Sequence, residues 1–298
     1  MPRPVLPLTL ALLAGALPLA AQNPDSVSFS RQRVADGLYM LRGAGGNVAV
    51  ASGKDGVYLV DDDFEPNAAR LREAVGKVAT GPVRFLINTH WHGDHTGGNA
   101  VLGGAGAIIV AQDNVRQRMS REQVMKSFNE TVPAAPPVAL PVITFTETMT
   151  LYLNGDTVDI VHAKNAHTDG DAIIHWRKAN VIHAGDTFFN GFYPFIDYES
   201  GGTVDGMIAA ADTILALSDD QTKIIPGHGP LGNKAQLRAF RDMMATVRLR
   251  FARARAEGKT TEQVVNAHLL SDLDATWGQG FLTTDQFSAF AYPAVPRP

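Results

Sequence analysis

The 298-residue chain contains no cysteine, so neither disulfide bonds nor thiolate metal ligands are available to it. It also has no excess of positive charge, because 26 lysines and arginines are set against 30 aspartates and glutamates, for a net charge of −4. That balance argues against a general nucleic-acid binder. Hydrophobic residues make up 45% of the chain, so a sizeable core is expected and no segment has the composition of a disordered region.

The N-terminal apolar run, Leu6 to Leu19, is too short for a comfortable membrane span. Arg3 precedes it and the small pair Ala20-Ala21 follows it, which is the pattern of a secretory signal peptide. An uncleaved membrane anchor is the alternative. We expect residues 1–21 to be a signal peptide and the mature protein to be periplasmic or secreted, with no stable membrane anchor after cleavage.

Short apolar segments then alternate with tight turns, which predicts many strands. Lys54-Asp55-Gly56 and Asn154-Gly155 each separate two such segments and predict hairpins. Strands are expected at Asn47–Ser52, Val57–Val60, Val83–Ile87, Ile108–Val110, Thr148–Leu153, Thr157–Val161, Ala172–Trp176, Asn180–Ala184 and Lys223–Pro226.

Helical periodicity appears at intervals between these strands. We expect one helix opened by Pro66, one over Gln112–Phe128, one capped by Asp205 and a long one over Leu237–Phe251. No composition break or flexible linker follows the leader, so residues 22–298 are predicted to form one domain, with helices from about residue 231 on. Hairpins with helices at intervals predict an α/β fold in which helices cover two sheets.

Four metal-capable side chains lie within six residues: His90, His92, Asp94 and His95. They follow the expected strand Val83–Ile87, and His, Asp and Glu are the zinc ligands open to a chain without cysteine. The next residues, Gly97-Gly98-Asn99, predict a turn in which Asn99 caps a helix. A histidine-rich surface loop is the alternative interpretation.

Three later residues share the features of this cluster, since each is metal-capable and lies beside a glycine or near the end of an expected strand. They are His167, Asp186 and His228. The order of these residues along the chain resembles the motifs of the metallo-β-lactamase superfamily. The matching positions are the run His90–His95, then His167, Gly185-Asp186 and Gly227-His228-Gly229. The resemblance covers roughly residues 37–229.

The resemblance implies a four-layer αβ/βα sandwich of two mixed β-sheets flanked by helices, with the metal site at one edge. It further implies that one zinc is held by His90, His92 and His167. A second zinc would be held by Asp94, His95 and His228. Asp186 would bridge the two ions, and Asp61 would support the ligand loop. Nitrogen and oxygen ligands of this kind also suit iron or manganese.

The chain departs from the commonest β-lactamase branch, which has a metal-binding cysteine near the place of Asp186. A bridging aspartate is more typical of glyoxalase II-like and lactonase-like members. His183 precedes Gly185-Asp186 and could orient a ligand, although a core histidine with a satisfied hydrogen bond is the favoured alternative.

Aromatic residues follow the Asp186 turn, and three of them, Phe188, Phe192 and Tyr193, predict the wall of a substrate pocket. Packing at the edge of the sandwich is the alternative. Lys234–Lys259 holds eight basic residues and two acidic ones. This segment could be a nucleic-acid surface, but the solvated face of a long helix is the favoured interpretation.

We therefore expect a hydrolase in which a hydroxide between two Zn²⁺ ions opens a carbonyl substrate such as a β-lactam, lactone or ester. Metal coordination lowers the pKa of a water from about 15.7 towards about 7. Asp94 and Asp186 are the expected catalytic residues, which would orient the hydroxide and relay a proton. The expected partner is a small molecule rather than a nucleic acid.

Four alternatives stay open on the same residues. They are a phosphodiesterase or nuclease, a glyoxalase II-like thioesterase, an iron-dependent oxidoreductase, and a metal-binding protein without turnover.

The leader gives a first testable prediction. Intact-mass analysis of protein from the envelope of its native host should show a chain that begins near Gln22, because cleavage is expected after Ala21. A full-length cytosolic species would contradict the predicted export.

Overall fold

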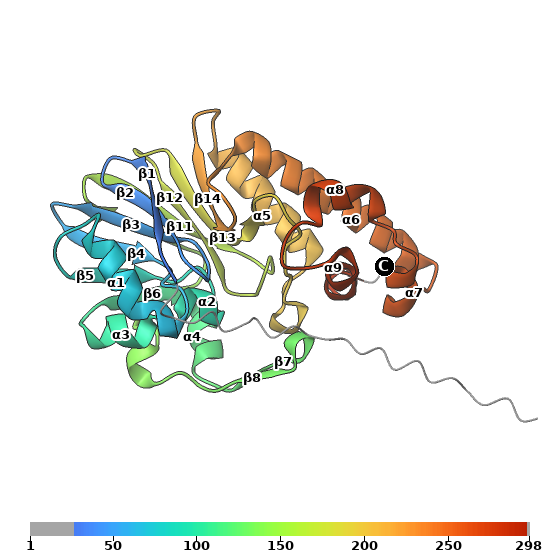
Figure 1. The fold of residues 1–298 in the computed structure, drawn as a ribbon, viewed down its shortest axis with the longest axis horizontal. Helices are drawn as coiled ribbons and strands as arrows, with labels where there is room; N and C mark the ends of the chain where they lie inside the picture. Colours follow the sequence, from blue (N-terminus) through green and yellow to red (C-terminus); the bar gives the residue numbers. More distant parts are fainter. Residues whose placement is uncertain (1–26, 297–298) are drawn as a thin grey trace, which may run out of the picture.

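Two mixed β-sheets lie face to face in the computed structural model, which describes residues 27–296 (Figure 1). The predicted signal peptide, residues 1–21, lies outside the described residues. The first sheet has the strand order β1 (Ser30–Ala35), β2 (Leu38–Arg42), β3 (Val48–Gly53), β4 (Gly56–Val60), β5 (Val83–Ile87), β6 (Ile108–Gln112) and β9 (Ile143–Phe145). Strands β1 to β4 are antiparallel neighbours, and the later pairs are parallel.

The second sheet has the strand order β10 (Thr148–Leu153), β11 (Asp156–Ala163), β12 (Asp171–Trp176), β13 (Val181–Phe189), β14 (Lys223–His228) and β15 (Gly232–Asn233). Its neighbours are antiparallel except for the parallel pair β13 and β14. A small separate hairpin joins β7 (Gln123–Met125) to β8 (Glu130–Val132).

Helices cover both outer faces (Figure 1). The helices before β10 are α1 (Ala68–Gly76), α2 (Gly93–Thr96), α3 (Asn99–Gly104) and α4 (Asp113–Met119). Those after β13 are α5 (Val204–Leu217), α6 (Lys234–Ala256), α7 (Thr261–Asn266), α8 (Asp274–Trp277) and α9 (Thr284–Ala291). Among residues 27–296, no helix is both long enough and apolar enough to span a membrane.

The core follows the alternation of side chains along the strands. In β3, Ala49 and Ala51 face the second sheet, whereas Val48 and Val50 pack with residues of α1 and α3. Ile182 of β13 lies in a further cluster, with α5, α6 and the C-terminal helices. The layers therefore run helix, sheet, sheet, helix, which confirms the predicted α/β sandwich.

The two predicted hairpins are present, and their turns bond to each other. Asn154 and Gly155 both have positive φ, 55° and 76°, as a two-residue type I′ turn requires. The Asp55 backbone N–H donates to Asn154 Oδ1 (2.9 Å), and the Asn154 N–H donates to Asp55 Oδ2 (2.7 Å). This reciprocal pair links the two sheets at one end.

Three local predictions are wrong. The helix expected over Gln112–Phe128 ends at Met119, because only its first turns bury apolar side chains and Val124 is half exposed. Asp205 does not cap α5, because Thr203 takes the N-cap position and accepts from the Gly206 N–H. Asn99 does not cap α3, because Gly98 takes the N-cap position.

Candidate metal centre

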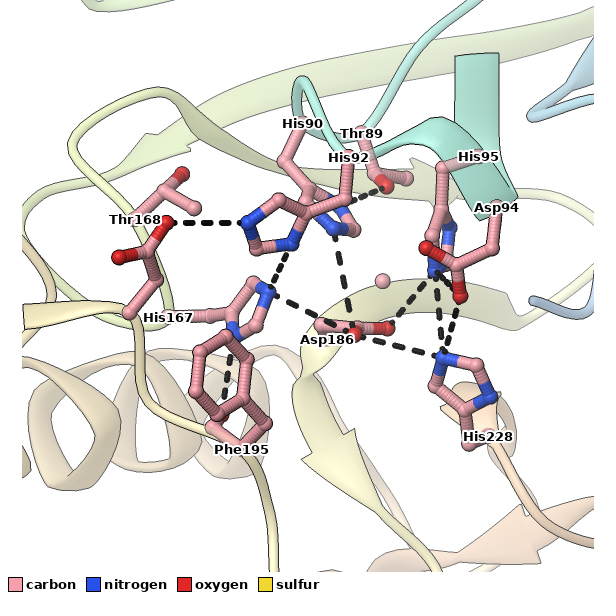
Figure 2. A network of polar contacts seen from close by, with 12 residues as sticks. Thr89, His90, His92, Asp94, His95, His167, Thr168, Asp186, Phe195 and His228 are labelled. Atoms are coloured by element: carbon pink, nitrogen blue, oxygen red, sulfur yellow. Dashed lines mark hydrogen bonds and ion pairs between the residues drawn. The ribbon is translucent and has the colours of Figure 1, made fainter. Parts of the chain in front are cut away.

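Seven side chains converge where strands of both sheets end (Figure 2). Four come from the loop and short helix after β5, one from the loop after β11, one from β13 and one from the end of β14. In that order they are His90, His92, Asp94, His95, His167, Asp186 and His228. The structure therefore brings together every residue that the sequence predicts as a ligand, at one edge of the sandwich.

Their ligand atoms fall into three groups, each with all atoms within 4.8 Å of one another. Two of the groups match the two ligand sets expected from the sequence: the first set is His90, His92 and His167, and the second set is Asp94, His95 and His228. The third group joins His90, His95 and Asp186, so it connects the two sets. A His and Asp cluster of this kind is suited to divalent metal ions.

The loop that carries the first histidines is closed by a pair of buried amides. Asn88 follows β5 directly, and its Nδ2 donates to Asn99 Oδ1 (3.0 Å), while Asn99 Nδ2 donates back to Asn88 Oδ1 (2.9 Å). Asn88 also donates to the His95 carbonyl (3.2 Å). Asn99 is thus the first residue of α3 and not its cap, because its side chain is used to hold the ligand loop.

Asp61, at the end of β4, orients two ligands. Its carboxylate accepts from the Thr89 N–H (2.7 Å), from Thr89 Oγ1 (2.8 Å) and from His95 Nδ1 (2.7 Å). Because the Thr89 hydroxyl proton goes to Asp61, the Oγ1 lone pair accepts from His90 Nδ1 (3.0 Å). His90 and His95 therefore both carry a proton on Nδ1 and direct Nε2 to the centre of the site.

His92 and His167 are oriented by other partners. His167 Nδ1 donates to the Phe195 carbonyl (2.8 Å), so its Nε2 faces the site as a lone pair. His92 Nε2 donates to Asp197 Oδ2 (3.0 Å), so its Nδ1 faces the site instead. These two inward nitrogens are 2.8 Å apart, where two lone pairs repel unless a cation or a proton lies between them.

Asp186 lies between the two sets, as Figure 2 shows. Its Oδ2 is 3.6 Å from His167 Nε2 and 3.4 Å from His228 Nε2. Its Oδ1 is 3.2 Å from His95 Nε2. One carboxylate thus has an oxygen within reach of ligands of both sets, which is the arrangement that a bridging ligand needs.

Two glycines allow the backbone to approach the ligands closely. A Cβ at Gly46 would lie 2.1 Å from His95 Cε1, and a Cβ at Gly227 would lie 1.9 Å from Asp186 Oδ1. Either contact is far too short for any larger residue. The glycine before His228 is therefore required by the close approach to Asp186.

Two histidines of the first set and both histidines of the second set have pKa values shifted in opposite directions. Burial lowers the pKa of His90 well below its ordinary value and lowers that of His167 to about 4. Burial also disfavours the charged forms of His95 and His228, but nearby carboxylates, Asp186 foremost, outweigh it. They raise the pKa of His228 to about 9 and that of His95 well above its usual value. The second set must therefore release protons when it binds a metal ion.

Three observations indicate that this set of side chains is suited to bind divalent cations. His90 Nε2 is buried and has no hydrogen-bond partner among the described residues. The inward nitrogens of the first set converge with their protons held on the far side of each ring. Asp94 and Asp186 are held ionised, because interactions with His95 and His228 outweigh burial and lower their pKa well below the ordinary value. A cation would bind the inward nitrogen lone pairs and would neutralise the charge of the two carboxylates.

The first set is closed and the second is open to solvent. The side chains of His90, His92 and His167 are all more than nine-tenths buried. Asp94 and His228 keep 21% and 22% of their side-chain surface exposed. Solvent therefore reaches the site from the side of Asp94 and His228.

The remaining predicted site residues have mixed outcomes. His183 is fully buried between two backbone groups, with Nε2 near the Asn47 carbonyl (3.0 Å) and Nδ1 accepting from the Gly185 N–H (3.1 Å). It contacts no ligand side chain through these bonds, so it acts as a satisfied core histidine that holds the turn before Asp186.

Two of the three predicted pocket aromatics belong to the core. Phe188 is fully buried and packs on Phe240, and Tyr193 stacks on Phe287 with ring centroids 4.3 Å apart. The pocket-wall prediction is wrong for Phe188 and Tyr193, because both side chains are buried in the hydrophobic core. Phe192 is partly exposed, and its place in a pocket stays a prediction.

Sequence reasoning missed Asp197 and Thr89, which orient His92 and His90. Asp197 follows the aromatic run and lies 105 residues from His92 in the sequence, so no local spacing relates the two. Thr89 directly precedes the histidine cluster, and a hydroxyl beside a metal-binding histidine was the available signal.

Comparison with known proteins agrees with this geometry. The family model of the metallo-beta-lactamase superfamily matches residues 41–228. A hydroxyacylglutathione hydrolase from Polaromonas sp. is 26% identical over 170 residues, which are 57% of this chain and 57% of that protein. One from Erythrobacter litoralis is 27% identical over 126 residues, 40% of this chain and 39% of that protein. The chain thus spans little more than half of the first relative and less than half of the second.

Solved structures share the fold at low identity. A metallo-beta-lactamase from Pontibacter korlensis superposes with a TM-score of 0.58 at 15% identity, over 73% of this chain and 99% of that one. The inverting sec-alkylsulfatase Pisa1 from Pseudomonas sp. superposes with a TM-score of 0.63 at 17% identity, over 88% of this chain and 50% of that one. At such identities the likeness shows the fold alone.

The contact between Asp197 and His92 gives a prediction about metal affinity. Asp197→Asn should weaken binding at the first set by about 10-fold to 100-fold, the usual cost of losing an orienting partner of a metal-binding histidine. Competition titration of the purified variant with a zinc chelator measures this affinity.

Glu199→Gln is the matched control, because Glu199 is a carboxylate of the same loop that accepts from the Lys126 N–H and contacts no ligand. If Asp197→Asn bound zinc as tightly as Glu199→Gln, the assigned role of Asp197 would be wrong.

Proposed function

Because the chain belongs to the metallo-beta-lactamase superfamily, we propose that it is a two-zinc hydrolase that opens the carbonyl group of an ester, lactone or β-lactam. Metal-dependent hydrolysis is the chemistry of the superfamily. The number of ions, their identity and the bond that is cleaved are the proposed parts.

The position of Asp186 is the main support for two metal ions. Its two oxygens face ligands of both sets, at 3.2 Å from His95 and at 3.4 Å and 3.6 Å from His228 and His167. Six further ligands surround it, which is more than one tetrahedral zinc site uses. A carboxylate shared by two such sets supports a pair of ions and not a single one.

The ions, when bound, would supply a water of lowered pKa and would polarise a carbonyl oxygen. The chain's own residues supply orientation and charge. Asp94 is ionised and partly exposed, so its carboxylate can accept a hydrogen bond from the attacking water on the open side. The buried first set excludes bulk water on the other side.

A second candidate is thioester hydrolysis, which the similarity to the two hydroxyacylglutathione hydrolases favours. The proposed export weighs against it, because a glutathione thioester is a cytosolic compound. An ester, lactone or lactam met outside the cytoplasm fits an exported enzyme better.

A substrate panel tests the proposal. Zinc-loaded protein is assayed against p-nitrophenyl esters, lactones, nitrocefin, a glutathione thioester and bis(p-nitrophenyl) phosphate. We expect carbonyl substrates to be opened, with the activity abolished by a chelator. Asp186→Ala should lower kcat/KM by at least about 100-fold, since it removes a shared ligand.

Asp159→Ala is the matched control, because Asp159 is a carboxylate of the second sheet that pairs with Arg177 away from the site. It should leave kcat/KM unchanged. The proposal fails if every carbonyl substrate is inert while the phosphodiester is turned over, an outcome that would establish a phosphodiesterase. Preferential turnover of the thioester would favour the second candidate.

A further inference from the structure

A segment outside the family match reaches the open side of the metal centre. It is the connection between α8 and α9, residues 278–283, whereas the match ends at residue 228. In Figure 1 this connection lies on the side of the C-terminal helices that faces β13. Its aromatic residue, Phe281, is 50% exposed.

Phe281 belongs to a group of three aromatic rings, two of which contact His228. Phe189 stacks on the His228 ring, with centroids 5.2 Å apart and an interplanar angle of 20°. The Phe281 ring lies 6.2 Å from Phe189, 6.0 Å from Phe192 and 6.4 Å from His228. We call Phe189, Phe192 and Phe281 the aromatic wall.

The connection that carries Phe281 is firmly anchored. The Tyr193 N–H donates to the Trp277 carbonyl (2.9 Å), which fixes the end of α8 against the loop that carries Phe192. Gly280 packs directly on Phe192, since a Cβ at Gly280 would lie 2.6 Å from the Phe192 Cβ. These two contacts hold the connection against the loop that carries Phe192.

The position of the aromatic wall matches the direction of access. The ligands with exposed surface are Asp94 and His228, and His228 is the one that Phe189 and Phe281 contact. A single exposed apolar residue needs no functional explanation. Phe281, however, packs on Phe189 and Phe192 and lies beside His228, the exposed metal-binding histidine. Its ring therefore borders the space that a substrate must enter.

We propose that the aromatic wall is a specificity subsite that binds an alkyl or aryl group of the substrate beside the second ligand set. This inference rests on the proposed function, because it assigns a substrate class to the same metal centre. It favours esters and lactones with an apolar chain over small polar ones. Phe281 and Phe192 would be the specificity-determining residues, since they keep exposed surface.

Alkyl hydroxamates test the subsite through binding, independently of turnover, because the hydroxamate group chelates zinc whatever chain it carries. Affinities of acetohydroxamate and octanohydroxamate for the zinc-loaded protein are measured by isothermal titration calorimetry. Wild type should bind the octanoyl compound at least about 10-fold more tightly, since each buried methylene is worth about a factor of four in affinity. Phe281→Ala should reduce this preference to about threefold or less, and Phe281→Leu should retain most of it.

Tyr152→Ala is the matched control, because Tyr152 is 78% exposed on β10, the edge strand of the second sheet. It should keep the wild-type preference. Zinc content and melting temperature are measured for every variant, so that a loss of metal at His228 is distinguished from a loss of apolar contact.

The outcomes separate the subsite from the proposed function. A wild type without chain-length preference, or a preference that Phe281→Ala leaves unchanged, overturns the subsite. If the hydroxamate preference is present and depends on Phe281 while no ester, lactone or β-lactam is hydrolysed, the subsite stands and the proposed function fails. If esters are hydrolysed, kcat/KM for p-nitrophenyl octanoate over the acetate should fall in Phe281→Ala in parallel with binding.

Discussion

The buried carboxylate of Asp61 is the constraint on which the metal centre depends. It lies at the end of β4 with a φ of 62°, and its carboxylate accepts hydrogen bonds from Thr89 and His95 in the loop and short helix that follow β5. By accepting from Thr89 and from His95 Nδ1, it fixes the proton position on His95 directly and on His90 through the Thr89 hydroxyl. The parallel pairing of β4 with β5 places these two strand ends side by side, so the fold itself delivers the carboxylate to the histidines.

A site arranged in this way is electrostatically unsatisfied without cations. Five histidines direct lone pairs, or protons held by raised pKa values, into a space that also holds the carboxylates of Asp94 and Asp186. The rings of His90, His92, His95 and His167 are each held from the far side by a buried hydrogen bond. Bound divalent ions would replace the protons of the second set and neutralise both carboxylates, so metal binding would stabilise the folded chain.

Sequence reasoning located the centre well because its ligands follow short apolar strands, and the ends of such strands are readable from periodicity. The strand Val83–Ile87 and the cluster after it were predicted with their observed bounds. Partners contributed by distant segments were not predictable, since nothing in the local pattern relates Asp197 to His92 or Phe281 to His228. Phe188 and Tyr193 were misplaced for a related reason: the sequence shows how many aromatics a loop carries but not which of them turn into the core. The single-domain prediction for residues 22–298 stays a prediction, although the C-terminal helices share one cluster of buried side chains with β13.

The central claim is that Asp186 lies between two metal ions held by the two ligand sets. X-ray absorption spectroscopy of the zinc-loaded protein at the zinc edge, combined with elemental analysis, tests it most directly. The structure predicts two zincs per chain, a coordination shell of nitrogen and oxygen without sulfur, and zinc–zinc scattering at about 3.5 Å, the separation usual for two-metal hydrolytic sites. One zinc per chain without a zinc–zinc signal, under zinc-replete conditions, would contradict it.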